Sequence, residues 1–390
     1  MRKWLIVLLI IMLPCIVSCG DRGESAQGFQ MTEVSGELQP EEESGVTEQE
    51  TQGETGLEPS EKERPAVKGI YVTGPVAGSE RMNDLITLVD ATELNTMVID
   101  VKNDEGEITW KMDTGSVLEM GNGVAYIRDI GALMETLKEH DIYTVARIVC
   151  FKDPVFAQNH INSALRKPDG GFVTDAYGLA WVNPYDEEVW AYLTEIAQAA
   201  LDVGFDEVQF DYVRFPIGQD ADAADYKVDM SVNTKEQAIS GFLSYAAEQI
   251  HEKGGVVTAD VFGTVIGSAT DIERVGQDYA ELGKTVDVLS PMVYPSHYGP
   301  GVFGFEVPDA HPYDTVYQAL MQSQEVLGQD TDECIVRPWL QAFTATWVSG
   351  HISYEGEQIQ EQIQAVYDAG YEEWILWNAT CRYPAEFSSE

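Results

Sequence analysis

The sequence predicts an α/β fold, a (β/α)8 barrel, for residues 67–390 of the 390-residue chain. Short apolar segments alternate there with longer amphipathic segments, as strands and helices do in this fold. Most of the short segments are apolar on both faces, which is typical of parallel strands covered by helices. No glycine-rich phosphate loop follows the first strand, where Thr73-Gly74-Pro75 stands. An open doubly wound sheet, the main alternative, usually carries such a loop.

The individual elements follow from hydrophobic periodicity and from turn residues. Strands are expected at residues 69–72, 96–101, 143–149, 207–213, 256–261, 286–292, 334–340 and 373–377. Helices are expected between them, among others at residues 127–140, 184–202, 234–253 and 357–369; the last three carry apolar residues at i, i+3 and i+4. Gly204 and Gly370 stand where two of these helices should end. The order of the elements is therefore that of a parallel barrel with helices outside.

The amino terminus has the pattern of an export signal. Arg2 and Lys3 precede an apolar run over residues 4–17, which is too short for a bilayer span of about 20 residues. The ending Ile16-Val17-Ser18-Cys19 resembles a bacterial lipobox, in which the cysteine is lipidated and becomes the first residue of the mature protein. We therefore expect residues 1–19 to be a lipoprotein signal peptide with Cys19 as the lipidation site; an ordinary signal peptide or an uncleaved anchor is the alternative. The domain would then lie at the extracellular face of the cell membrane, lipid-anchored, or be secreted.

Residues 20–66 differ sharply in composition from the rest of the chain. They are rich in Glu, Gly, Ser, Thr and Gln and contain few large apolar residues. Such a segment cannot bury enough surface to offset the entropy of ordering, so a disordered acidic linker is expected. The formal net charge of the whole chain is −43. This charge argues against nucleic acid as a partner, because phosphate binding needs clustered Lys and Arg.

Cysteine and histidine usage indicates no metal or redox chemistry. Within the predicted barrel the cysteines are Cys150, Cys334 and Cys381. This odd number forms no disulfide framework, and buried free thiols are expected. Neither these cysteines nor the acids and histidines show metal-ligand spacing. The sequence therefore predicts no metal and no cofactor.

Polar and aromatic residues stand at most of the expected strand ends. The carboxyl ends of barrel strands converge at one mouth, where active sites of this fold lie. The residues concerned are Asp100 and Lys102 on the second strand, Arg147 on the third, Gln209, Asp211 and Arg214 on or after the fourth, Asp260 on the fifth, Tyr294 and His297 after the sixth, Trp339 and Gln341 at the seventh, and Trp377 and Asn378 at the eighth. So many polar strand ends are hard to explain by packing. We expect all of them except the two acids Asp211 and Asp260 to bind substrate.

Acids combined with aromatic residues suit glycoside cleavage, which needs one protonated and one ionised carboxyl group. Gln209 and Asp211 are two residues apart on one strand, so both point toward the barrel interior. Asp211 is therefore the first candidate for a catalytic carboxylate. Asp260 is the candidate proton donor, and the loop acids Asp104, Glu105 and Glu306 are alternatives to it. In the structural alternative, Asp211 only pairs with Arg147 or Arg214, and Trp339 and Trp377 belong to the barrel core.

Several blocks of the sequence resemble a known family. They are Lys68-Gly69-Ile70-Tyr71-Val72-Thr73, Val98-Ile99-Asp100-Val101-Lys102, Gln209-Phe210-Asp211-Tyr212-Val213-Arg214-Phe215-Pro216, Ser290-Pro291-Met292-Val293-Tyr294-Pro295-Ser296-His297-Tyr298 and Pro338-Trp339-Leu340-Gln341. The family is described as a "putative glycosyl hydrolase domain", and the resemblance extends from Lys68 to about Pro384. It implies a barrel related to α-amylase-type glycosidases, whose nucleophile is an Asp at the end of strand four and whose acid/base is a Glu at the end of strand five. Asp211 matches the first position, and Asp260, an Asp in place of Glu, stands at the second.

The sequence thus predicts a glycoside hydrolase acting on an extracellular or cell-wall polysaccharide or oligosaccharide. In the expected retaining mechanism Asp211 is the nucleophile and Asp260 the acid/base; carboxyl groups about 5–5.5 Å apart would fit retention, and roughly 9 Å would fit inversion. One alternative is a non-catalytic surface glycan-binding lipoprotein with a degenerate barrel. Another is a polysaccharide deacetylase, but that chemistry commonly uses a metal with His and Asp ligands, and the six histidines provide no obvious set.

Overall fold

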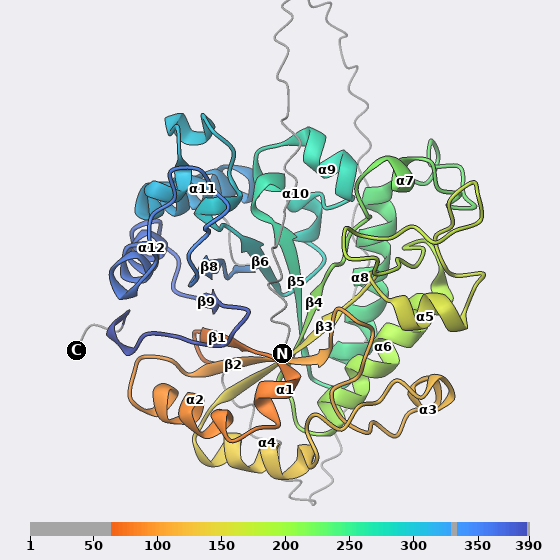
Figure 1. The fold of residues 1–390 in the computed structure, drawn as a ribbon, viewed down its shortest axis with the longest axis horizontal. Coiled ribbons are helices and arrows are strands. Elements are labelled where there is room, and N and C mark those ends of the chain that lie inside the picture. The colour runs from red at the N-terminus through yellow and green to blue at the C-terminus, as the bar shows by residue number, and fades with distance from the viewer. Residues whose placement is uncertain (1–63, 329–333, 388–390) are drawn as a thin grey trace, which may run out of the picture. The chain divides into compact units, whose positions relative to one another are not determined.

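The computed structural model describes residues 64–328 and 334–387. The predicted signal peptide, Cys19 and nearly all of the predicted linker lie outside these residues. The described chain forms a closed barrel of parallel strands surrounded by helices (Figure 1). The predicted (β/α)8 fold class is therefore confirmed.

All strand pairs in the barrel are parallel. The strands are β1 (Lys68–Val72), β2 (Thr96–Lys102), β3 (Tyr143–Val149), β4 (Glu207–Asp211), β5 (Val256–Phe262), β6 (Val288–Met292), β7 (Ile335–Val336), β8 (Trp339–Gln341) and β9 (Trp374–Trp377). Their order is β5-β4-β3-β2-β1-β9-β8-β6-β7, and a further pairing of β5 with β6 closes the barrel. β7 and β8 are two halves of the predicted strand 334–340, so the closed sheet has eight strand positions.

The break between β7 and β8 falls at Arg337 and Pro338. Proline has no N–H to donate to a neighbouring strand. Pairing nevertheless continues on both sides, because the Arg337 N–H donates to the carbonyl of Leu289 at 2.8 Å and the Ile375 N–H donates to the carbonyl of Pro338 at 3.0 Å. The interruption therefore leaves the barrel closed.

The other predicted strands agree with the structure to within one or two residues at each end. The largest difference at a carboxyl end is β4, which stops at Asp211 rather than at residue 213. Tyr212 has a φ of 50°, in the left-handed region that non-glycine residues rarely adopt. The chain therefore turns out of the sheet directly after Asp211.

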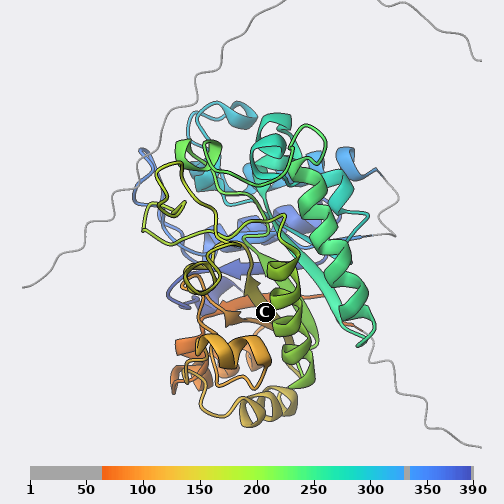
Figure 2. The same cartoon turned by 90° about the vertical axis from the view of Figure 1, so that its right-hand side faces the viewer.

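The helices lie outside the barrel. They are α1 (Gly74–Ala77), α2 (Arg81–Asp90), α3 (Gly115–Met120), α4 (Ile130–Glu139), α5 (Pro154–Asn159), α6 (Glu187–Asp202), α7 (Gln219–Asp222), α8 (Lys235–His251), α9 (Ala269–Val275), α10 (Tyr279–Leu282), α11 (Pro312–Leu327) and α12 (Gly356–Asp368). The four helices predicted by residue range correspond to α4, α6, α8 and α12. Gly204 and Gly370, with φ of 109° and 81°, follow α6 and α12 as predicted. The long helices α6 and α8 run side by side (Figure 2).

Side chains on the two faces of the barrel wall differ in character. The outward-facing residues are apolar and pack against the helices; Phe210 of β4, for example, meets Phe242 of α8 edge-on at 5.2 Å. The inward-facing residues of β3 to β5 are largely polar, as with Arg147, Gln209 and Asp260. The main apolar core therefore lies between sheet and helices, and the interior of the barrel holds polar groups.

The three cysteines of the described residues, Cys150, Cys334 and Cys381, are buried free thiols, as predicted. None of the helices that the structure describes is long and apolar enough to cross a membrane.

Candidate active site

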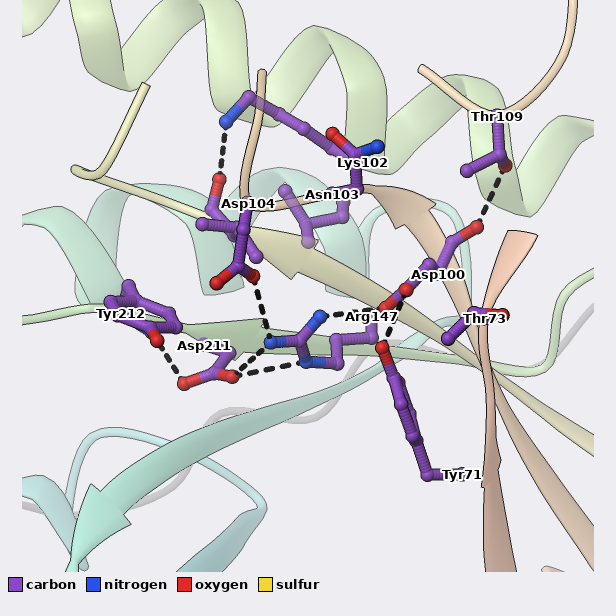
Figure 3. Close-up of polar contacts among 12 residues, drawn as sticks. Tyr71, Thr73, Asp100, Lys102, Asn103, Asp104, Thr109, Arg147, Asp211 and Tyr212 are labelled. Carbon is purple, nitrogen blue, oxygen red and sulfur yellow. Dashed lines mark hydrogen bonds and ion pairs between the residues drawn. The ribbon is translucent and has the colours of Figure 1, made fainter. Parts of the chain in front are cut away.

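Arg147 lies at the centre of a charged cluster inside the barrel (Figure 3). Its Nη1 donates to Asp100 at 2.6 Å, and its Nε and Nη2 donate to Asp211 at 3.0 and 2.5 Å. Its Nη2 also lies 3.5 Å from a carboxylate oxygen of Asp104. Burial alone would lower the pKa of this guanidinium, but the carboxylates of Asp211 and Asp100 raise it well above its ordinary value. Arg147 is therefore a permanent positive charge that holds three acids together, Asp100 and Asp211 on strands and Asp104 in the loop after β2.

Both carboxylate oxygens of Asp211, the last residue of β4, are held by hydrogen bonds. Arg147 donates to Oδ2, and the N–H of Tyr212 donates to Oδ1 at 2.6 Å. The left-handed backbone of Tyr212 accompanies this second bond, and such strain is usually retained only where the surroundings enforce it. The side chain of Asp211 is 12% exposed, so the fixed carboxylate still reaches the surface. This geometry suits a group that must meet a ligand in one orientation.

Asp260 on β5 stands beside Asp211, as the register of β4 and β5 requires. Its Oδ1 accepts hydrogen bonds from Gln209 Nε2 at 2.6 Å and from Trp339 Nε1 at 2.7 Å. Its Oδ2 is buried and has no hydrogen-bond partner among the residues that the structure describes. Burial first, and the nearby charge of Asp211 second, raise the pKa of Asp260 well above its ordinary value, although the bonds from Trp339 and Gln209 act against this rise. The environment therefore favours the protonated acid.

Asp100 and Asp104 have different environments. Burial raises the pKa of Asp100 to about 6, even though Arg147 and a 2.6 Å hydrogen bond from the Tyr71 hydroxyl favour its ionised form. Burial would also raise the pKa of Asp104, but Arg147 and Lys152 outweigh it and bring the pKa below its ordinary value. Asp104 is thus held as a carboxylate, which argues against it as the proton donor.

The other two loop acids are exposed. Glu105 follows β2, and Glu306 lies in the long loop after β6. Neither side chain forms a hydrogen bond with the acids described above in the part of the chain that the structure describes.

Of the residues expected to bind substrate, Lys102 and Gln341 are buried and Asn378 is half-buried, and all three form hydrogen bonds within the protein. Lys102 is fully buried, forms an ion pair with Asp153 at 2.8 Å and donates to a backbone carbonyl; Figure 3 shows its ammonium group directed away from Arg147. The side-chain amide of Gln341, also fully buried, donates to Asp309 at 3.0 Å and accepts from a backbone N–H. Asn378 donates to a loop carbonyl. The structure gives no support for substrate contacts by Lys102 and Gln341, because their polar groups are already satisfied away from the surface.

The remaining predicted binding residues lie near the acids or near one another. Trp339 is only 2% exposed, as the barrel-core alternative expected, but its indole N–H contacts Asp260. Trp377 is half-buried, Tyr294 packs against it at 5.9 Å, and the exposed His297 ring lies 5.1 Å from Tyr294. Arg214 is surrounded by aromatic rings, with Trp181 at 4.9 Å.

Sequence reasoning did not assign roles to two residues of the cluster. Tyr71, at the end of β1, bonds Asp100, and Lys152 bonds Asp104 while its ammonium lies 3.7 Å from the centre of the Tyr212 ring. The polar strand ends that marked the other residues also mark Tyr71. Lys152 likewise lies just beyond the end of β3, but no pattern in the sequence indicates its contact with Asp104.

Within the described residues, no group of three or more His, Cys, Asp or Glu side chains is arranged to hold a metal ion.

Comparisons with known proteins agree with the fold. The structure resembles the glycoside hydrolase domain of PgaB (BpsB) from Bordetella bronchiseptica, with a TM-score of 0.61 and 12% identity over 81% of this chain and 95% of that chain. It also resembles a beta-galactosidase from Marinomonas ef1, with a TM-score of 0.55 and 10% identity over 80% of this chain and 53% of that chain. A hypothetical protein from Ruminiclostridium thermocellum is 35% identical over 49% of this chain and 97% of that chain, with a TM-score of 0.45.

No curated protein matches the sequence. A family model with the description "Putative glycosyl hydrolase domain" matches residues 69–383. This match covers nearly all of the described barrel and includes every acid of the cluster. The chain therefore belongs to this glycosyl hydrolase family, and both the predicted resemblance and the predicted enzyme class, a glycoside hydrolase with a carbohydrate substrate, are confirmed.

Proposed function

We propose that the protein hydrolyses an extracellular or cell-wall polysaccharide or oligosaccharide by a retaining mechanism, with Asp211 as nucleophile and Asp260 as acid/base. The observation that carries this proposal is the contrast between two neighbouring acids. Asp211 accepts hydrogen bonds on both oxygens, chiefly from Arg147, whereas the environment of Asp260 favours its protonated form. Glycosidases separate their two carboxyl groups in this way, with one ionised and one protonated.

The first step of the proposed reaction forms a covalent intermediate. A carboxylate oxygen of Asp211 attacks the anomeric carbon while the bond from that carbon to the leaving oxygen breaks. Asp260 gives its proton to the leaving oxygen, so the released sugar departs as an alcohol. In the second step the Asp260 carboxylate takes a proton from water, which attacks the same carbon and releases Asp211.

The neighbouring groups would keep the two acids in their roles. Arg147 fixes the direction of the Asp211 carboxylate, and its positive charge compensates the negative charge that returns to Asp211 in the second step. Gln209 and Trp339 hold one oxygen of Asp260, which leaves the other oxygen without a protein partner to carry the transferable proton. Gln209 and Trp339 would thus act as positioning residues rather than as direct substrate ligands.

The proposed location is the extracellular face of the cell membrane, with the lipid anchor on Cys19. The support is the basic start, the short apolar run and the lipobox-like ending of residues 1–19. An acidic linker would then separate the barrel from the membrane surface, where polymeric substrates are accessible.

The test is reducing-sugar release by the full chain in mild detergent from a panel of bacterial and host polysaccharides. We expect release that falls about 10³-fold or more in Asp211→Asn, because an amide cannot replace the carboxylate that attacks the anomeric carbon. Asp84→Asn, an exposed acid on α2, is the matched control and should keep full activity. Release that survives Asp211→Asn would refute the assignment. Tight binding of a polymer without any release would favour the glycan-binding alternative.

The stereochemical part of the proposal has its own measurement. Proton NMR of the products in the first minutes of reaction distinguishes the two anomers. Retention of the anomeric configuration supports Asp211 as nucleophile. Inversion would instead show that one acid activates water while the other protonates the leaving oxygen.

A further inference from the structure

We infer that a row of aromatic side chains leading from the acids to the surface forms a binding subsite for additional sugar units of a polymer, with Trp347 as its outermost platform. The aromatic row consists of Tyr71, Trp377, Phe343 and Trp347. The inference rests on the proposed function, because it extends the same site. It adds that the preferred substrate is a chain of several sugars rather than a disaccharide.

The inner end of the row is joined to the charged cluster. Tyr71 donates its hydroxyl proton to Asp100, which in turn is bonded to Arg147. Trp377 stacks on Tyr71, with ring centres 6.4 Å apart and planes inclined by 20°. A ligand lying on the inner part of the row would therefore lie close to the carboxyl groups.

The row continues outward through two further contacts. Phe343 meets Trp377 edge-on at 5.1 Å, and Trp347 stacks on Phe343 at 5.9 Å with planes 18° apart. Exposure rises along the row, from 7% at Tyr71 to 42% at Trp347. Three consecutive ring-to-ring contacts thus connect the charged cluster to the exposed ring of Trp347.

The loop that carries Trp347 is held at several points. The N–H of Ala342 donates to the carbonyl of Trp377 at 3.1 Å, the N–H of Tyr354 donates to the Thr344 hydroxyl at 3.0 Å, and the N–H of Ile352 donates to Asp309 at 3.2 Å. One face of the Trp347 ring is covered by Phe343. The platform is therefore formed before a ligand arrives, so binding would cost little ordering entropy.

The chemistry of the row indicates the class of ligand. All four side chains are uncharged, and their flat apolar faces match the C–H faces of pyranose rings. Arg147, which lies 5.4 Å from the centre of the Tyr71 ring, and Lys152 are paired with acids, and Arg214 packs against the ring of Trp181. We therefore commit to the neutral portion of an oligosaccharide as the occupant.

The experiment compares long and short sugars by calorimetry. The full chain in mild detergent, carrying Asp211→Asn to prevent turnover, is titrated with cellohexaose, chitohexaose and maltohexaose and with the corresponding disaccharides. We expect at least one hexasaccharide to bind more tightly than its disaccharide. Adding Trp347→Ala should lower the affinity for that hexasaccharide about tenfold, the effect of losing one good aromatic stack. The affinity for the disaccharide should fall much less.

Two further variants serve as controls. Trp347→Phe keeps an aromatic face and should retain most of the hexasaccharide affinity. Tyr177→Ala removes a different aromatic side chain, 69% exposed on the loop between α5 and α6, and should change nothing. Unchanged unfolding midpoints would show that each variant is folded.

Three results would overturn the inference: no hexasaccharide binds better than its disaccharide, Trp347→Ala leaves the hexasaccharide unaffected, or Tyr177→Ala causes the same loss. Calorimetry needs no hydrolysis, so the outcome is independent of the catalytic test. Trp347-dependent binding without any hydrolysis by the unmodified chain would refute the proposed function and keep the subsite. Hydrolysis that needs Asp211, without Trp347-dependent binding, would support the proposed function and refute the subsite.

Discussion

Replacing Asp100 by asparagine should change how the stability of the protein depends on pH. Burial raises the pKa of Asp100 from 3.8 to about 6 in the folded protein. Between these two values the folded state keeps a proton that the unfolded state has released, so wild-type stability falls as pH rises through this window. At about 1.36 kcal/mol for each pKa unit, the loss amounts to about 3 kcal/mol at neutral pH. Asparagine does not titrate and should show no such loss.

The assay is urea unfolding of the wild type and Asp100→Asn at pH 4, 5, 6 and 7. Asparagine also weakens the contacts with Arg147 and Tyr71, which shifts the whole curve of the variant by a constant amount. The change with pH in the difference between the two free energies of unfolding therefore isolates the contribution of the Asp100 pKa. We expect the wild type to lose about 2.5 kcal/mol relative to the variant between pH 4 and 7. Parallel curves would refute the reasoning, and Asp84→Asn should give a curve parallel to the wild type.

Two further predictions concern buried contacts inside the barrel. Trp339→Phe removes an indole N–H that favours the ionised form of Asp260, so the pKa of Asp260 should rise further. The alkaline limb of the kcat/KM profile, measured from pH 4 to 10, should then move to higher pH. A profile that stays in place or moves to lower pH would contradict the role of Asp260 as acid. Arg337→Met removes a fully buried guanidinium that bonds Glu207 at 2.7 and 3.1 Å and Glu373 at 3.0 Å. Two buried carboxylates then lose this partner, and urea unfolding should show a loss of about 3–5 kcal/mol; a loss below about 1 kcal/mol would show that the ion pairs add little to stability.

The fold could be predicted well from the sequence because its signal is local and repeated. Period-2 and apolar runs mark the strands, and glycines such as Gly204 and Gly370 mark helix ends. The two departures also have local causes that the pattern alone did not reveal. The pattern over residues 334–340 predicts one continuous strand, because hydrophobicity does not register that Pro338 lacks an N–H. The alternation through Asp211 to residue 213 likewise does not show that the backbone turns out of the sheet at Tyr212.

The candidate site could be predicted only in part. The carboxyl ends of parallel strands must converge, so strand position was enough to bring Asp100, Arg147, Asp211 and Asp260 together. It could not separate residues that face a ligand from those that satisfy buried partners. Lys102 is engaged by Asp153, from a loop about fifty residues further along the chain, and no local pattern encodes such a contact. Trp347 lies beyond the strand ends, so strand position does not indicate it either.

The opposite character of the two faces of the barrel wall has a consequence for how such a protein can change over evolutionary time. Outward-facing residues such as Phe210 secure the fold against the helices, whereas inward-facing residues such as Gln209 and Asp260 belong to the proposed active site. Neighbouring positions on one strand therefore answer to different selective pressures. Interior positions such as Gln209 and Asp260 can therefore change while the outer layer keeps the barrel folded, so new specificities can arise without a new architecture.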